Sequence, residues 1–236
     1  MRFAAVGLAL AACGRFGFDP DTAVVADARD GNAIADATHI APAFVQATDL
    51  SQSGSAVSVT YANSVTAGDL LVVAVGTNTS AITAIIDSNG DEFDMLPELV
   101  TPATSPMYVA FAIARMSGSD TITAAIDGSD FAAVRIHEYT NVAANPLDTY
   151  ATSSGSNAGI DAISVELTTA YDHELVFAYA ISENDTASAG TGFTARSIIS
   201  GDVSEDAIEV APGVHAITAT DASSPWAIVA LAFEGS

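Results

Sequence analysis

The hydrophobic residues from Ala43 onward fall in short runs rich in Val, Ile, Ala, Thr and Tyr, separated by Gly, Asp, Asn and Ser. This pattern is typical of β-strands joined by tight turns, and no run has the periodicity of an amphipathic helix. It predicts strands at residues 44–50, 56–61, 69–77, 82–87, 107–115, 121–126, 131–139, 162–167, 174–181, 193–198, 206–210, 214–220 and 226–233. So many short strands need stacked sheets, because one open sheet of that width would curl or split.

The order of these runs is repeated along the chain. The segment 57–59 is similar to one that lies 106 positions later, and 68–74 is similar to one 105 positions later. Two later segments, 120–123 and 131–139, are each similar to a segment 95 positions further along the chain. Two such halves fit a jelly-roll sandwich, whereas unrelated β-patterned segments that happen to look alike are the alternative. We therefore expect an all-β fold, a two-sheet antiparallel β-sandwich that is jelly-roll-like and has an internal pseudo-repeat.

Composition and charge exclude one class of partner. The 236 residues are 50% hydrophobic and 15% charged, which indicates one folded domain. They include 29 acidic and only 6 basic residues, all arginine, for a net charge of −23. Such a chain repels phosphate backbones and lacks a basic patch, so nucleic acid is excluded as a partner.

The N-terminus carries the most specific motif. After Met1-Arg2, an apolar run at residues 3–12 ends in Leu-Ala-Ala followed by Cys13. The run is shorter than the roughly 20 residues that a membrane-spanning helix needs. It resembles a bacterial lipoprotein signal peptide, which implies removal of residues 1–12 and acylation of Cys13 as an anchor in a lipid bilayer. The alternative is a free thiol behind an ordinary signal peptide.

The segment after the cysteine is expected to be a tether. Residues 14–19, Gly-Arg-Phe-Gly-Phe-Asp, resemble the start of lipoproteins of myxobacteria and their relatives. Residues 19–42 are rich in Asp and Ala and have no apolar periodicity, so we expect a flexible acidic linker, with a short helix at 23–28 as the alternative. The expected organisation is a signal peptide at 1–12, a lipidated cysteine and tether at 13–42, and a β-sandwich at 43–236, in the cell envelope at the outer membrane or cell surface.

Several short motifs resemble a jelly-roll-like module found in secreted and surface proteins of environmental bacteria. They are Ala67–Leu71, the turn Asp87–Gly90, the strand end His137–Val142, Gly192–Thr194 and the last strand, Trp226–Phe233. The resemblance implies an accessory or binding domain in that compartment.

One strand carries a candidate ligand surface. Arg135, His137 and Tyr139 alternate with Val134, Ile136 and Glu138, so the first three share a face that we expect to point away from the core. The spacing of 95 places alanine opposite Arg135 and His137 in the second half. Such a polar strip with an aromatic neighbour can hydrogen-bond to a sugar and stack on it, and a plain solvated face is the alternative.

A second candidate is a calcium site at Asp87, Asn89, Asp91 and Asp94, whose oxygens are hard ligands suited to Ca²⁺. An EF-hand is excluded because the glycine is fourth in this loop rather than sixth. A β-turn at residues 89–90 without metal is the alternative. Another acidic group is interpreted as a solvated sheet edge: Asp202, Glu205, Asp206 and Glu209.

No catalytic set stands out. The chain has no Gly-x-Ser-x-Gly elbow, no His-Glu-x-x-His pair and no lysine, and no catalytic residue is assigned. We therefore expect a non-enzymatic, lipid-anchored protein that displays its β-sandwich for binding, with a glycan or another envelope component as partner, or as a structural element. The alternative is a carbohydrate-active hydrolase or lyase on the same scaffold.

Overall fold

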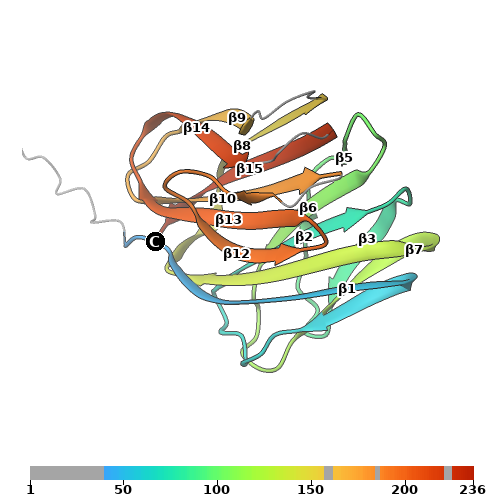
Figure 1. Cartoon of the computed structure of the whole chain (residues 1–236). Coiled ribbons are helices and arrows are strands. Elements are labelled where there is room, and N and C mark those ends of the chain that lie inside the picture. The colour runs from blue at the N-terminus through green and yellow to red at the C-terminus, as the bar shows by residue number, and fades with distance from the viewer. Residues whose placement is uncertain (1–39, 157–161, 184–186, 221–224) are drawn as a thin grey trace, which may run out of the picture. The chain divides into compact units, whose positions relative to one another are not determined.

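The computed structural model describes residues 40–156, 162–183, 187–220 and 225–236. They belong to one compact unit, Thr38–Ser236, which is an all-β, antiparallel β-sandwich (Figure 1). The predicted leader, Cys13 and the tether as far as residue 39 lie outside the described residues. Within the described ranges, no helix is long and apolar enough to cross a membrane.

The first sheet has seven strands and contains the two longest strands of the fold. Its hydrogen-bonded order is β1-β7-β2-β6-β4, with β3 added to β7 and β5 added to β6. The strands are β1 (Ala43–Thr60), β2 (Leu70–Thr77), β3 (Ile82–Asp87), β4 (Asp94–Met95), β5 (Leu99–Val100), β6 (Pro106–Ile113) and β7 (Thr121–Thr140).

The long strands β1 and β7 each take part in two layers. Phe131–Thr140 of β7 lies between β1 and β2, whereas the earlier part of β7 lies between β3 and the end of β1. The pairing of β1 with β7 shifts register between Gly54 and Ala56, where such an irregularity allows the pair to bend. The first sheet therefore forms an inner layer and a smaller outer layer.

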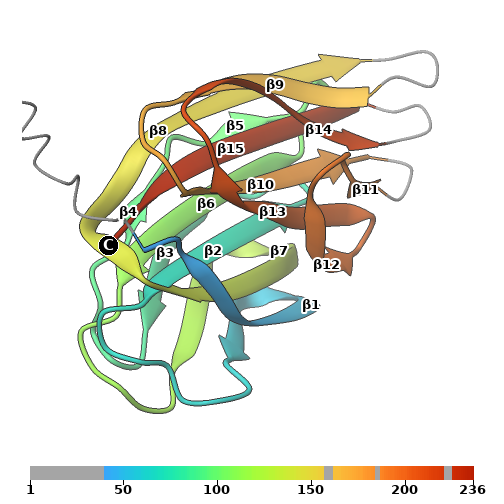
Figure 2. The ribbon, with the colours of Figure 1, turned by 90° about the vertical axis from the view of Figure 1, so that its left-hand side faces the viewer.

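The second half of the chain forms two separate sheets. The inner one has the order β12-β13-β10-β15-β8, and the outer one has the order β11-β14-β9 (Figure 2). The strands are β8 (Val142–Ser156), β9 (Ala162–Thr169), β10 (Glu174–Ser182), β11 (Ser188–Ala189), β12 (Thr194–Ile199), β13 (Asp202–Val210), β14 (Gly213–Thr220) and β15 (Pro225–Gly235).

Three hydrophobic cores separate these layers. The central core lies between the two inner layers and includes Val72, Phe111, Phe177 and Leu231. A second core fills the space between the inner and outer layers of the first half, and a third does so in the second half. Every residue of β2 and of β10 is therefore buried, which is why these strands are apolar along most of their length instead of alternating.

The strand pairings repeat between the two halves, as the sequence predicts. Val57 of β1 pairs with Ala124, and Ile163 of β9 pairs with Ala219. Ile163 lies 106 residues after Val57, and Ala219 lies 95 residues after Ala124, so both offsets agree with those in the sequence. In the inner layers the spacing differs, because Leu70 pairs with Tyr139 and Leu175 with Phe233. The last strand is therefore offset by 94 residues, and the predicted offset of 95 is wrong there by one.

The prediction also missed a strand at the polar edge of the second half. The segment Val142–Ser156, which contains Pro146 and several Ser, Thr and Asn residues, forms the edge strand β8. Edge positions tolerate such residues because one side of the strand needs no hydrogen-bond partner in the sheet. The jelly-roll connection of the strands stays a prediction.

Candidate functional site

The candidate ligand residues of β7 lie in the centre of the molecule. Arg135, His137 and Tyr139 do share one face, as predicted, but that face is covered by the second inner layer and all three side chains are 0% exposed. The expectation of a solvent-facing strip is therefore wrong. The alternation within one strand shows which side chains share a face, whereas it does not show whether a second sheet covers that face.

Each of the three side chains meets a polar residue of β13 across the space between the inner layers. The Arg135 guanidinium lies 3.3 Å from Asp202 Oδ2, His137 Nε2 lies 2.9 Å from Ser204 Oγ, and the Tyr139 hydroxyl donates to Asp206 Oδ2 at 2.8 Å. We call these three pairs the polar row. The interpretation of the acids of β13 as a solvated edge is therefore wrong, since Asp202, Glu205 and Asp206 are buried. The side chain of Glu209 lies outside those described.

Further contacts satisfy most of the polar atoms in the row. Arg135 donates to the hydroxyl of Tyr179 at 3.0 Å and to the carbonyl of Ile199, and its guanidinium carbon lies 4.9 Å from the centre of the Tyr179 ring. At the other end, Arg196 holds Asp206 through two hydrogen bonds of 2.7 and 2.9 Å. Burial lowers the pKa of His137 to about 3, so this imidazole is neutral in the folded protein.

The symmetry-related part of the same interface is apolar. With the offset of 94, the second half has Val229, Leu231 and Phe233 where the first has Arg135, His137 and Tyr139, and these three belong to the central core. There Phe233 meets Phe111 edge to face, with ring centres 5.4 Å apart. Polar contacts thus replace apolar ones in only one of two equivalent strips between the halves.

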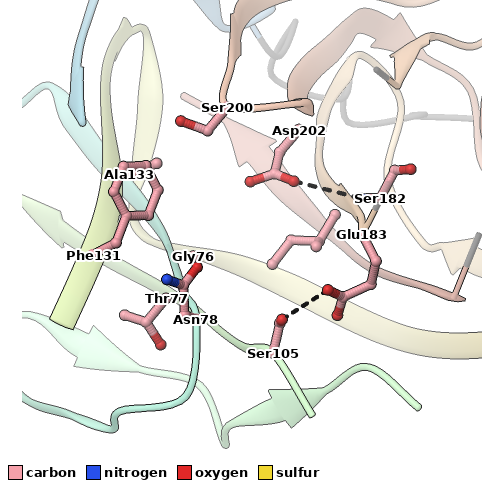
Figure 3. Close-up of a pocket in the computed structure, with 11 residues that line it drawn as sticks. Gly76, Thr77, Asn78, Ser105, Phe131, Ala133, Ser182, Glu183, Ser200 and Asp202 are labelled. Carbon is pink, nitrogen blue, oxygen red and sulfur yellow. Dashed lines mark hydrogen bonds between the residues drawn. The ribbon is translucent and has the colours of Figure 1, made fainter. Parts of the chain in front are cut away.

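A small cleft opens where the polar row reaches the end of the inner layers. Its volume is about 90 Å³, and it lies between the ends of β2 and β10 and the start of β13. Figure 3 shows Asp202, Ser182 and Glu183 on one side of it and Phe131, Thr77 and Asn78 on the other. We call it the seam cleft, because both halves of the chain contribute to it.

Both carboxylates of the seam cleft are held by neighbouring groups. Asp202 accepts from the Tyr179 hydroxyl at 3.2 Å and from the Ser182 backbone at 3.4 Å, besides its ion pair with Arg135. Burial raises the pKa of Asp202 to about 6, although the charge of Arg135 lowers it. Glu183 accepts from the hydroxyls of Thr101 and Ser105, the latter at 2.9 Å.

Gly76 explains how the inner layers approach so closely beside this cleft. A Cβ atom at this position would lie 2.5 Å from the Tyr179 hydroxyl and 3.3 Å from Asp202 Oδ2. Only a residue without a side chain leaves room for these two groups at that point. The glycine therefore allows the tyrosine and the aspartate to reach Arg135.

The acidic loop is partly as predicted. Asp87 and Asp91 come together with Asp120, so that one carboxylate oxygen of each lies within 4.8 Å of the others. Asp94 does not belong to this group and is exposed in β4, whereas Asn89 lies half-buried in the loop between Asp87 and Asp91. Asp120 was missed because it is distant in sequence; the pairing of β3 with the start of β7 brings it beside Asp87.

Trp226 and Glu138 both have partners within the fold. Trp226 is 8% exposed and packs in the outer core of the second half. Glu138 hydrogen-bonds to a loop, where its Oε1 accepts from the Thr66 backbone at 2.9 Å, and its Oε2 accepts from Gln46 at 2.6 Å. These residues have structural roles and offer no surface for a ligand.

Comparisons with known proteins add no further identification. No family model, curated protein or solved structure matches the chain.

Proposed function

We propose that the chain is a lipid-anchored cell-envelope protein that displays its β-sandwich on a tether and binds a sugar residue of a glycan in the seam cleft. The observation that carries the binding proposal is the lining of this cleft. Hydroxyl and carboxylate groups of Ser182, Glu183 and Asp202 stand opposite the ring of Phe131 there, and the Asn78 amide lies on the same side as the ring. Such a lining can hydrogen-bond to sugar hydroxyls and cover one face of a sugar ring.

The place of the cleft also supports this proposal. Ligand sites occur preferentially where two structural units meet, and the seam cleft lies between the two halves. The ion pair of Arg135 with Asp202 and the contacts of Glu183 hold its polar groups in fixed positions. Preorganised groups of this kind lose little freedom when a ligand binds. The small volume of the cleft fits the edge of one sugar residue rather than a long chain.

A glycan screen tests the binding site. The mature chain carrying Cys13→Ser, which has no thiol to acylate, would be screened against immobilised glycans, and we expect selective retention of one group of structures. Asn78→Ala and Phe131→Ala should weaken that binding at least tenfold. Val214→Ser, which changes an exposed side chain elsewhere, is the control. Absence of selective retention, or equal binding by all variants, would contradict the site.

A separate experiment tests the anchor. Cells that express the unchanged chain should incorporate labelled fatty acid into it and retain it in the membrane fraction. Cys13→Ser should abolish the label and release the protein or change its location. Labelling and fractionation that do not change in the variant would disprove lipid anchoring without affecting the glycan result.

One observation favours a second candidate, a carbohydrate-active hydrolase or lyase. The seam cleft contains two carboxylates, and Asp202 has a pKa near 6, where a general acid can function. The glycan that binds best would be incubated with the protein, and release of shorter sugars would be measured. Loss of that release in Glu183→Gln, with binding retained, would support the enzyme; intact glycan after incubation with the unchanged chain would support binding alone.

A further inference from the structure

Three acidic side chains meet at one end of the first outer layer, away from the seam cleft. Asp87 is the last residue of β3, Asp91 follows in the loop after it, and Asp120 directly precedes β7. The antiparallel pairing of β3 with β7 places Asp87 opposite Ile122 and so brings the two strand ends together. Three carboxylates are thus concentrated at one corner by the topology of the sheet.

In each carboxylate, one oxygen is fixed by hydrogen bonds from neighbouring groups. Asp87 Oδ1 accepts from the backbone of Gly90 at 2.7 Å and of Asp91 at 2.9 Å. Asp91 Oδ1 accepts from the backbone of Arg115 at 2.8 Å, and Asp120 Oδ1 accepts from the Ser88 hydroxyl at 2.9 Å. All three side chains are therefore held in place by their Oδ1 atoms.

The other oxygen of each carboxylate has no donor. Asp87 Oδ2, Asp91 Oδ2 and Asp120 Oδ2 are all buried and none of them accepts a hydrogen bond. Asp120 as a whole is 0% exposed and Asp91 is 8% exposed. Buried charged oxygens without a partner are strongly unfavourable unless a cation or a proton joins them. This is a second feature, distinct from the closeness of the three acids, and it points to a ligand.

No arginine of the described residues supplies the compensating charge. The Arg115 side chain is half exposed and its guanidinium pairs with Glu92 at 2.8 Å, while Arg135 and Arg196 are paired with acids of β13. The three carboxylates at this corner therefore have no described arginine as their partner.

We propose that Asp87, Asp91 and Asp120 form a binding site for one divalent cation, with Ca²⁺ as its ligand. Three carboxylate oxygens fixed within 4.8 Å of one another match the hard oxygen donors that Ca²⁺ takes, and water completes the coordination. Mg²⁺ is smaller and demands near-octahedral geometry at shorter distances, so Ca²⁺ fits this set better. The bound ion joins the loop after β3 to the start of β7.

The repeat supplies an internal comparison. His215 directly precedes Ala216, the residue of β14 that corresponds to Thr121, and so it stands where the first half has Asp120. His215 Nε2 lies 2.8 Å from the carbonyl of Ala211 and 3.1 Å from the Thr169 hydroxyl. Among the described residues the second half has no acidic triad at this corner. One site per chain is therefore expected.

Calcium titration of the full mature chain tests the proposal. After removal of metals with a chelator, calorimetry at pH 7.5 should show one Ca²⁺ bound per chain, at least tenfold more tightly than Mg²⁺, and the melting temperature should rise with Ca²⁺. The absence of Ca²⁺ binding at millimolar concentration would overturn the proposal. Equal affinity for Mg²⁺ would overturn the assignment to Ca²⁺.

Variants locate the site. Asp120→Asn and Asp91→Asn should each weaken Ca²⁺ binding at least tenfold, and without Ca²⁺ they should melt higher than the unchanged chain because one repelling charge is removed. Asp94→Asn, at the start of β4 and outside the triad, should bind Ca²⁺ normally. Retention of full affinity in both triad variants would overturn the site. If one variant does not fold, the other and the direct titration still decide.

Discussion

At the scale of single residues, Arg135 shows how this protein keeps a charge in its interior. The guanidinium is fully buried, and it contacts Asp202, the Tyr179 hydroxyl and the Ile199 carbonyl. Removing one member of a buried ion pair leaves the other charge without compensation. We therefore expect Arg135→Met to lower the free energy of unfolding at pH 7.5 by about 3 to 5 kcal/mol, as measured by urea denaturation.

A matched exposed pair is the control for that prediction. Arg115 and Glu92 also form an ion pair, but their side chains are 53% and 84% exposed. Arg115→Met should change the stability by no more than about 0.5 kcal/mol. The loss in Arg135→Met should also become smaller at pH 5, where Asp202 is protonated. Equal stability of the two variants would show that the buried pair contributes nothing.

Glu174 is a residue whose charge should destabilise the fold at alkaline pH. Burial raises its pKa to about 8, and the charge of Asp148 adds to the shift. Because the pKa in the folded state lies above its ordinary value, the folded protein binds more protons, and stability from this group falls as the pH rises toward 8. Glu174→Gln should therefore melt higher than the unchanged chain at pH 9 and equally at pH 5. Glu166→Gln, at an exposed position, should show no such difference.

At the scale of elements, the contact of β2 with β10 depends on Gly76. Gly76→Ala should lower stability by about 1 to 3 kcal/mol, the usual cost of an added methyl group in a packed interior. The close contact is with the Tyr179 hydroxyl. Tyr179→Phe should therefore cost less in the alanine background than in the unchanged chain, and a double-mutant cycle by urea denaturation measures the difference. Additive effects would show that another contact is responsible.

The strands illustrate what the sequence pattern could reveal. The apolar runs predicted β2, β6, β10 and β15 well, since long apolar runs are typical of strands buried on both faces. The same runs also indicate that the two predicted sheets are too few. A strand that is buried on both faces needs a further layer of structure on each side of its sheet. The edge strand β8 gave no apolar signal and could not be found in this way.

The candidate sites show why the remainder was not predictable. A one-residue error in the offset placed alanine opposite Arg135 and His137, although the true counterparts are Val229 and Leu231. A slip of one residue exchanges the two faces of a strand. The comparison with alanine therefore suggested a solvent-facing strip, whereas the correct comparison with Val229 and Leu231 indicates a face in the core. Asp120 lies in another part of the chain from Asp91, and only the pairing of strands joins them.

At the scale of the whole molecule, the boundary between the proposed tether and the folded unit can be tested. The compact unit begins at Thr38, and the backbone N–H of Ile40 donates to the carbonyl of Ser236 at 2.7 Å. Figure 1 shows the C-terminus beside the start of β1. Deleting residues 24–37 should leave the melting temperature nearly unchanged, whereas a deletion extended to Pro42 should lower it. A large decrease with the shorter deletion would show that the tether contributes to folding.

The polar row also decides which halves can associate with each other. Two copies of the first half, packed in the same way, would bury Arg135 and His137 against the apolar residues of β6, without an acid or a hydroxyl to receive them. Two copies of the second half would place Asp202 and Asp206 against Val229 and Phe233. In the second case Asp206 would keep its ion pair with Arg196. Each homodimer would still contain one buried unpaired charge, Arg135 in the first and Asp202 in the second, and such a charge strongly disfavours the wrong partner. Expressed as two separate polypeptides, the halves should therefore assemble one to one, and the covalent chain makes that heterodimer permanent.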